Sequence, residues 1–279
     1  NGVAESLDQK IISDAEALFN NKQKIQLTYN IQNTDRAVGT RLSGEIMFLH
    51  GPGGFKGNIQ YRMTGVAGQS MGAYLVDGIE LRLKGIANDY VGKGMNGGLI
   101  TIRLDKQVRD RRKNMTIIGN TALYGATGGR IHIAGKAGER FAVRNSGATA
   151  VVEGIGNHGC EYMTRGTIIV LDSIGQNFGA GMTGGIAFLY SKTKNNLDYI
   201  NKNYVKATEL LADDELLILR LLRSHRFHTR SHIAKDIITH WNKEKIHFSK
   251  IVPKAMENIN LDKRTVIGIE YREVFHFCF

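Results

Sequence analysis

The chain has 279 residues, of which 33 are glycine and only 2 are proline, and its formal net charge is +11. This length suits one large domain, or a domain with a smaller appendage, and abundant glycine without a G-x-y register excludes collagen. No stretch reaches the ~18 consecutive apolar residues of a membrane span, so we expect no membrane partner.

The basic charge is spread along the chain, and its one dense cluster lies in an insertion at 106–114 that we interpret as a solvated loop. The cluster consists of Arg109, Arg111, Arg112 and Lys113. We therefore expect no nucleic-acid partner. The two cysteines, Cys160 and Cys278, provide neither a disulfide framework nor a CxxC pair. Their spacing fits a reducing compartment such as the cytoplasm.

The first part of the chain, 1–32, is a predicted lead-in of one helix and one strand. Apolar residues at helical spacing over 4–19 predict the helix. From Ile25 to Gln32 apolar and polar residues alternate strictly, which predicts a half-buried strand. The polar first ten residues carry no readable signal or transit peptide, and the start at Asn1 indicates a fragment of a longer chain.

Glycines recur with a period of about 19 residues in the second part, 33–190. The marker glycines are Gly57, Gly78, Gly98, Gly129, Gly147, Gly166 and Gly185. A second series keeps step with them, at 68–69, 87–88, 119–120, 138–139, 156–157 and 175–176. The one long interval, between Gly98 and Gly129, holds the charged insertion. Periodicity of roughly 20 residues is typical of a solenoid in which each repeat stacks on the next.

Within each repeat, the residues two and four past the marker glycine are mostly aliphatic and alternate with other residues. Ile100 and Ile102 follow Gly98 in this way, and Ile168 and Val170 follow Gly166. Alternation at period two directs one set inward and the other outward. A coil of this length holds strands and corners but no helix. The predicted fold class is therefore all-β, a right-handed parallel β-helix, with glycines at the corners.

The third part, 191–279, is a predicted connector and helical tail. Glycine almost disappears here. Asp213 is placed to cap a helix through Leu222, and a second helix is expected over 231–242. Pro253 marks a break. This tail could fold back and cap the open end of the solenoid.

Three GxGxxG strings, at 92–97, 154–159 and 179–184, would be a dinucleotide fingerprint if read alone. That motif requires a strand before it and a helix after it, whose N-terminus meets the pyrophosphate. The first and third strings run directly into predicted strands. We interpret the matches as by-products of turn glycines, so no cofactor-binding residue is predicted.

Two groups of side chains are candidate chemical sites. His158 and Cys160 lie in one short string with Glu161 and could share a side, but a buried structural cysteine is the favoured interpretation. The second group is His225, His228 and His232. The pair at i, i+4 could bind zinc, but no HExxH glutamate is present and basic neighbours oppose a cation, so a solvated face is favoured. No catalytic or metal-binding residue is predicted.

Several longer strings are specific. They are Asn33–Gly39, Ala87–Gly94, Gly119–Thr127, Gly138–Ala148, His158–Thr164 and Gly181–Gly185. Together they resemble the C-terminal GXGXG β-helix domain of the glutamate synthase large subunit, from about Leu7 to Lys254. The last residues, 258–279, do not resemble the tail of that family.

The resemblance implies a structural scaffold without catalysis of its own. The full enzyme of that family makes glutamate from glutamine and 2-oxoglutarate. Its FMN and iron–sulfur cluster belong to other domains, so no cofactor is expected in this chain. The implied partners are the amidotransferase and FMN-binding synthase domains, with a small electron-donor subunit or ferredoxin, in the cytoplasm or plastid stroma. The alternative is a free-standing interaction subunit of another oxidoreductase complex.

Overall fold

The structure, a computed structural model, describes residues 6–16, 24–111, 115–193 and 195–256. Its helices are α1 (Leu7–Glu16), α2 (Thr40–His50), α3 (Lys106–Arg111), α4 (Ala212–Thr229), α5 (His232–Thr239) and α6 (Trp241–Glu244), with short 3₁₀ turns at Asn195–Asp198, Lys245–His247 and Lys254–Met256. Its strands are β1 (Lys24–Ile31), β2 (Asn58–Ala67), β3 (Ile79–Ala87), β4 (Asn96–Arg103), β5 (Thr116–Ile118), β6 (Gly128–Ala137), β7 (Ser146–Gly154), β8 (Arg165–Val170), β9 (Ile186–Tyr190), β10 (Val205–Thr208) and β11 (Phe248–Pro253).

The lead-in is confirmed as a helix followed by a strand, α1 and β1. Helix α2 was not predicted from the sequence, and the charged insertion contains the short helix α3 instead of loop alone. In the tail, both predicted helices are present as α4 and as α5 with α6. The N-cap position of α4 is Leu211, and the predicted cap Asp213 lies in the first turn of the helix. Asp214 accepts a hydrogen bond from Leu211 N–H at 2.9 Å.

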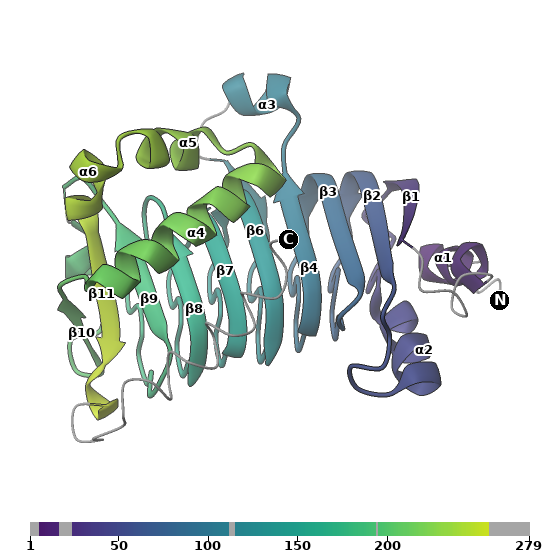
Figure 1. Ribbon diagram of the computed structural model, residues 1–279, viewed down its shortest axis with the longest axis horizontal. Coiled ribbons are helices and arrows are strands. Elements are labelled where there is room, and N and C mark those ends of the chain that lie inside the picture. Colours follow the sequence, from purple (N-terminus) through teal and green to yellow (C-terminus); the bar gives the residue numbers. More distant parts are fainter. Residues whose placement is uncertain (1–5, 17–23, 112–114, 194, 257–279) are drawn as a thin grey trace.

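All eleven strands belong to one sheet, which forms an elongated stack (Figure 1). Its order is β1-β2-β3-β4-β6-β7-β8-β9-β11-β10, and β5 pairs with β3 and β6. Successive repeats pair in parallel, so that Ile59 lies beside Ile79 and Ile131 lies beside Ala150. The register that the glycines predict holds from β4 to β6, where Ile100 lies beside Ile131, and from β8 to β9, where Ile168 lies beside Ala187. At β7 it is wrong by one residue, because the partner of Ile131 and of Ile168 is Ala150, three past Gly147.

The predicted fold class, an all-β right-handed parallel β-helix, is wrong. The sheet is of mixed direction, because β11 runs antiparallel to both β9 and β10, and six α-helices accompany it in the described ranges. The period of about 19 reports only how one repeat sits on the next. The glycine period does not predict the path of the tail, which returns after α6 and adds β11 beside β9. It also does not predict the helices that pack on the strands.

Two apolar clusters hold the molecule together. The larger lies on the inner side of the strands and includes Ile100, Ile131, Ile168 and Cys160, all fully buried. The second lies on the other side of β7, β8 and β9, where residues such as Phe188 meet the apolar face of α4 and α5. Since these strands bury both faces, Val151 and Val152 are both fully buried although they are neighbours.

Helix α4 crosses the strands diagonally (Figure 1). The tail was predicted to cap the open end of the solenoid. Helix α4 instead covers the outer side of the sheet. Ile218, Leu221 and Leu222 form its buried face. Burial of three such side chains stabilises the docking by several kcal/mol, at about 1.5–3 kcal/mol for each large aliphatic side chain.

Candidate functional site

The glycine-rich turns between the strands have one repeated backbone geometry. In six successive turns, three residues with positive φ alternate with residues of ordinary φ. They are Ser70, Gly72 and Tyr74; Tyr90, Gly92 and Gly94; Thr121, Leu123 and Gly125; Arg140, Ala142 and Arg144; His158, Cys160 and Tyr162; and Asn177, Gly179 and Gly181. Their φ angles all lie between 53° and 74°. Since eleven of the eighteen are not glycine or asparagine, the surroundings must compensate for the conformational cost.

The compensation comes from hydrogen bonds between neighbouring turns. In the first five turns the first and third residues donate their N–H groups to carbonyls of the following turn, and in all six turns the second residue donates to the preceding one. Gly92 N–H thus donates to Met71 O at 2.9 Å, and Gly94 N–H donates to Tyr124 O at 2.8 Å. The turns form a ladder of their own beside the sheet.

This ladder explains the GxGxxG strings at 92–97, 154–159 and 179–184. A phosphate site needs free N–H groups at a helix N-terminus. In the first string Gly92 and Gly94 use their N–H groups within the ladder, and β4 follows, starting at Asn96. Gly179 N–H donates likewise, to Gly159 O at 2.8 Å. These three amides offer no phosphate cradle.

The N-terminal end of the ladder is closed by a side chain. Asp8 on α1 is 4 % exposed and accepts hydrogen bonds from Gly39 N–H at 2.6 Å and Arg41 N–H at 2.9 Å. In the later turns, the N–H group at the position of Gly39 donates to a carbonyl of the preceding turn. At Gly39 the Asp8 carboxylate accepts this hydrogen bond in place of a carbonyl. Burial raises the pKa of Asp8, and the two backbone hydrogen bonds oppose the rise.

His158 and Cys160 are not brought together. Cys160 points into the core and is fully buried, as favoured from the sequence, and burial raises the pKa of its thiol. The His158 side chain is 41 % exposed, and its Nδ1 lies 2.7 Å from Glu161 Oε1. Asn177 also donates to that oxygen, at 2.8 Å. A thiolate nucleophile needs a base beside it, which this geometry does not supply. Cys278 lies outside the described residues.

The three tail histidines also do not lie together on one face. The predicted solvated face is wrong for His225, which is fully buried, while His232 on α5 is exposed. His225 and His228 face His132 of β6, with ring centroids 5.6 Å and 5.3 Å from it. Ser224 Oγ lies 3.1 Å from His132 Nε2. Within the described ranges, no three His, Cys, Asp or Glu side chains are arranged to hold a metal ion.

We call His132, His225 and His228 the histidine cluster. The surroundings oppose protonation of two members, His132 and His228. Burial lowers the pKa of His132 well below its usual value, and the neighbouring histidines, Arg130 and Arg82 lower it further. Burial also lowers the pKa of His228, to about 4. His132 was not predicted from the sequence, although its place among the outward residues of an alternating strand was a signal for it.

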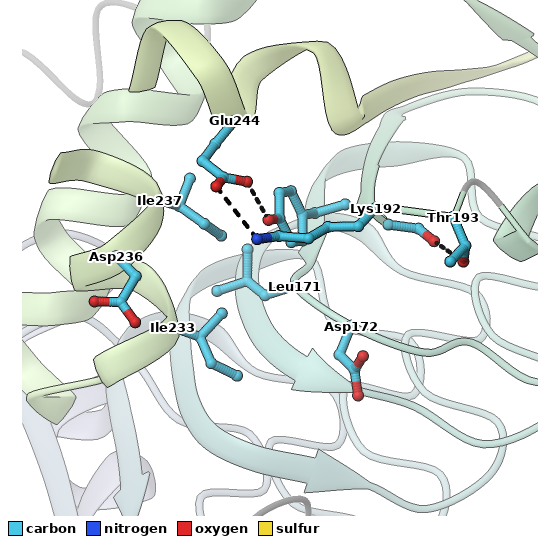
Figure 2. Close-up of a pocket in the computed structure, with 10 residues that line it drawn as sticks. Leu171, Asp172, Lys192, Thr193, Ile233, Asp236, Ile237 and Glu244 are labelled. Carbon is cyan, nitrogen blue, oxygen red and sulfur yellow. Dashed lines mark hydrogen bonds and ion pairs between the residues drawn. The ribbon is translucent and has the colours of Figure 1, made fainter. Parts of the chain in front are cut away.

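A cleft of about 420 Å³ opens between α5, α6 and the ends of β8 and β9 (Figure 2). Leu171, Ile233 and Ile237 contribute apolar side chains to its lining. At its rim Glu244 accepts a hydrogen bond from Tyr190 Oη at 2.5 Å and lies 3.3 Å from Lys192 Nζ.

Tyr190 and Glu244 at the rim of the cleft shift each other's pKa. Burial and the bond to Glu244 raise the pKa of Tyr190, and the same bond lowers the pKa of Glu244. A tyrosine with a raised pKa is a poor acid and a weak nucleophile near neutral pH. Among the described helices, none is long and apolar enough to cross a membrane.

Comparisons with known proteins agree on one family. The family model described as "GXGXG motif" matches residues 8–254. The chain is similar to the NADPH glutamate synthase large chain of Azospirillum brasilense, at 47% identity over 260 residues. It is also similar to the ferredoxin-dependent glutamate synthase of Pyropia yezoensis, at 46% over 257 residues, and to the chloroplastic one of Spinacia oleracea, at 42% over 255 residues.

These matches cover nearly all of this chain and a small part of each relative. They span 92%, 91% and 90% of the chain, respectively, but only 17%, 17% and 16% of the relatives. The chain thus spans about a sixth of the length of the curated relatives that it matches.

Proposed function

Because the chain belongs to the GXGXG motif family, we propose that it is the scaffold part of a glutamate synthase. In this role it holds the glutaminase and FMN-binding domains of a longer protein together and performs no catalysis of its own. The full enzyme would form glutamate from glutamine and 2-oxoglutarate.

One observation carries the proposal. The backbone polar groups of the repeated turns are used between neighbouring turns, at 2.8 to 3.0 Å, and the inward side chains fill a closed apolar core. A stack whose polar groups are satisfied internally is rigid and offers its outer side chains to partners. The match to the GXGXG motif family model extends over this whole stack, 8–254.

The proposed role assigns the cofactors elsewhere. FMN and the iron–sulfur cluster would be held by the other domains, and ferredoxin or a small NAD(P)H-linked subunit would supply electrons. Within this chain we propose three parts, the lead-in 1–32, the glycine-rich stack 33–190 and the connector with helical tail 191–279.

A chimera tests the proposal. The matching segment of the Azospirillum brasilense large chain is replaced by residues 8–254 of this protein, and a second form simply lacks the segment. We expect the chimera to retain flavin and to form glutamate from glutamine and 2-oxoglutarate. The form without the segment should lose flavin or fail to assemble, because its catalytic domains lack their common support.

Two variants of the chimera test the absence of chemistry. His158→Gln and Tyr190→Phe each remove a candidate reacting group, and we expect activity to change by less than about twofold. A loss of tenfold or more with flavin content unchanged would mean that the chain takes part in catalysis. A purified 279-residue chain that binds flavin, or a chimera that remains flavin-free and inactive, would instead favour an interaction subunit of another oxidoreductase.

A further inference from the structure

The stack ends in a strand whose second edge is unpaired. Among the described strands, β1 pairs only with β2, and Figure 1 shows it at the N-terminal end of the stack. In a parallel pair, alternate residues of a strand bond to one neighbour, so the remaining backbone N–H and C=O groups of β1 point away from β2. An edge of this kind is a template for pairing with a further strand.

The features that usually protect an edge strand are missing from β1. The strand is eight residues long, it contains no proline, and its only charged residue is Lys24 at its first position. Its pairing with β2 runs without a register shift, so no bulge bends it away. The strand at the other edge of the sheet, β10, is only four residues long and carries Lys206. Shortness and an edge lysine oppose pairing at β10, and neither operates at β1.

The inward side chains of β1 are only partly covered. Each is half-buried, whereas its partner on β2 is at most 1 % exposed. The pairs are Ile25 with Ile59, Leu27 with Tyr61, and Tyr29 with Met63. Helix α1 meets this inward side through the Tyr29 side chain, whose hydroxyl donates a hydrogen bond to Asp14 at 2.6 Å. A further strand beside β1 would remove apolar surface from water, which favours its binding.

The alternation of side chains makes β1 complementary to itself. In an antiparallel pair, residues directly opposite each other lie on the same face of the sheet. A two-fold axis at Thr28 meets this condition along the whole strand. It sets Thr28 against Thr28, Gln26 against Asn30, Leu27 against Tyr29 and Ile25 against Ile31. Lys24 then lies opposite Gln32, so no like charges meet. Paired threonines and aromatic–aliphatic pairs stabilise antiparallel sheets.

The same symmetry closes the assembly. Both copies use the same edge, so the junction leaves no unpaired edge from which a filament could grow. Pairing of β1 with β10 of a second copy would continue without limit. However, β10 offers four residues against eight and has Lys206 among them, which makes it the poorer partner.

We propose that two copies of this protein associate by antiparallel pairing of β1 with β1. Backbone hydrogen bonds along the strand join the two sheets, and the inward side chains of each copy cover those of the other. The faces fix the register, because a shift by one residue would set apolar side chains opposite polar ones.

Sedimentation velocity of the 279-residue protein measures the association. Between about 1 and 100 μM we expect a concentration-dependent change from monomer to dimer. Thr28→Lys sets two ammonium groups against each other at the two-fold axis and should raise the dissociation constant at least about tenfold. The matched control is Thr64→Lys, the same substitution at an exposed outward position of β2. It should leave the dissociation constant within about twofold.

A disulfide tests the register in a Cys278→Ser background, where the remaining Cys160 is fully buried. Thr28→Cys places two thiols at opposite positions, with Cα atoms about 4.5–5.5 Å apart, which a disulfide can span. Oxidised glutathione is the oxidant, and each bond formed between two protein thiols reduces one molecule of it to two of glutathione. We expect a covalent dimer from Thr28→Cys and from a mixture of Gln26→Cys and Asn30→Cys proteins. Gln26→Cys alone should give none, because its two thiols would lie about 13 Å apart along the strands.

A protein that sediments as a monomer even at about 100 μM would overturn the proposal. A dimer that Thr28→Lys does not weaken, or that Thr64→Lys weakens as much, would place the contact on another surface. A dimer that Thr28→Cys does not cross-link, or that Gln26→Cys alone cross-links equally fast, would refute the pairing about Thr28. Because Thr28 and Thr64 are exposed, circular dichroism melts of their variants should match the parent protein and exclude unfolding as the cause.

Discussion

The histidine cluster predicts that the protein loses stability on mild acidification. The perturbation is a change from pH 6.5 to pH 5. The pKa of His132 is well below its usual value in the folded protein, and that of His228 is about 4. In the unfolded chain both titrate near 6.5. Between these values the unfolded chain binds more protons than the folded one, so the free energy of unfolding falls as the pH falls.

The magnitude follows from the number of protons. Each histidine that is protonated only in the unfolded chain lowers the free energy of unfolding by about 1.4 kcal/mol per pH unit. His132 is 1 % exposed and contributes about 2 kcal/mol over this interval of about 1.5 units. His228 is partly exposed, and solvent screening reduces its share to roughly 1 kcal/mol. The expected total is roughly 3 kcal/mol.

The charged groups around the cluster support this direction. From β3 and β6, Arg82 and Arg130 oppose its protonation, while Glu80 favours that of His228. From β7, Glu153 Oε1 lies 3.8 Å from His225 Nε2 and also accepts a hydrogen bond from Ser231. Full stability is expected above pH 7, and it should decline progressively toward pH 5.

Urea unfolding at several pH values between 7.5 and 5 measures the effect. His132→Gln should reduce the slope against pH by about 1.4 kcal/mol per unit, even if it lowers stability at every pH. The matched control, His240→Gln, changes an exposed histidine and should leave the slope intact. A slope that His132→Gln does not change, or a protein that becomes more stable at pH 5, would refute the reasoning.

Three further predictions concern the core and the turns. Asp8→Ala should lower the free energy of unfolding, measured with urea, by about 2–4 kcal/mol because two backbone N–H groups lose their acceptor. A decrease below about 0.5 kcal/mol would contradict the capping role. Gly98→Ala should lower the free energy of unfolding by at least about 2 kcal/mol, and Gly125→Ala by only about 1 kcal/mol. Both glycines have positive φ, but only at Gly98 would a Cβ lie 2.7 Å from two backbone carbonyl oxygens. Equal melting temperatures of the two variants would contradict this. Cys160 should react with a maleimide only on unfolding, since it is fully buried, and fast labelling of the native Cys278→Ser variant would argue for an open core.

The sequence predicted the stacking because stacking is local. A glycine period and a period-two alternation both report how one repeat sits on the next, and Ile100, Ile131 and Ile168 are buried as their positions require. Positions such as Leu123 and Arg144, which adopt positive φ without being glycine, could not be recognised from composition. Their conformation is imposed by hydrogen bonds to neighbouring turns.

The tail could not be placed for the opposite reason. Nothing in the residues of β11 specifies that it runs antiparallel beside β9, because that pairing is set by the path of α4, α5 and α6 over the sheet. The histidine cluster depends on the same path. His132 and His225 are far apart in sequence and meet only because α4 crosses β6, so the spacing of tail histidines alone predicted a solvated face.

The ladder of turns also bears on where function can evolve in this fold. Each of the first five turns donates to both of its neighbours, so a change in one of them disturbs two others. A free N–H cradle for a ligand cannot be opened there without breaking bonds on both sides. Outward side chains carry no such constraint. Arg223 and Phe227 on α4 are exposed, so they can change without cost to the core.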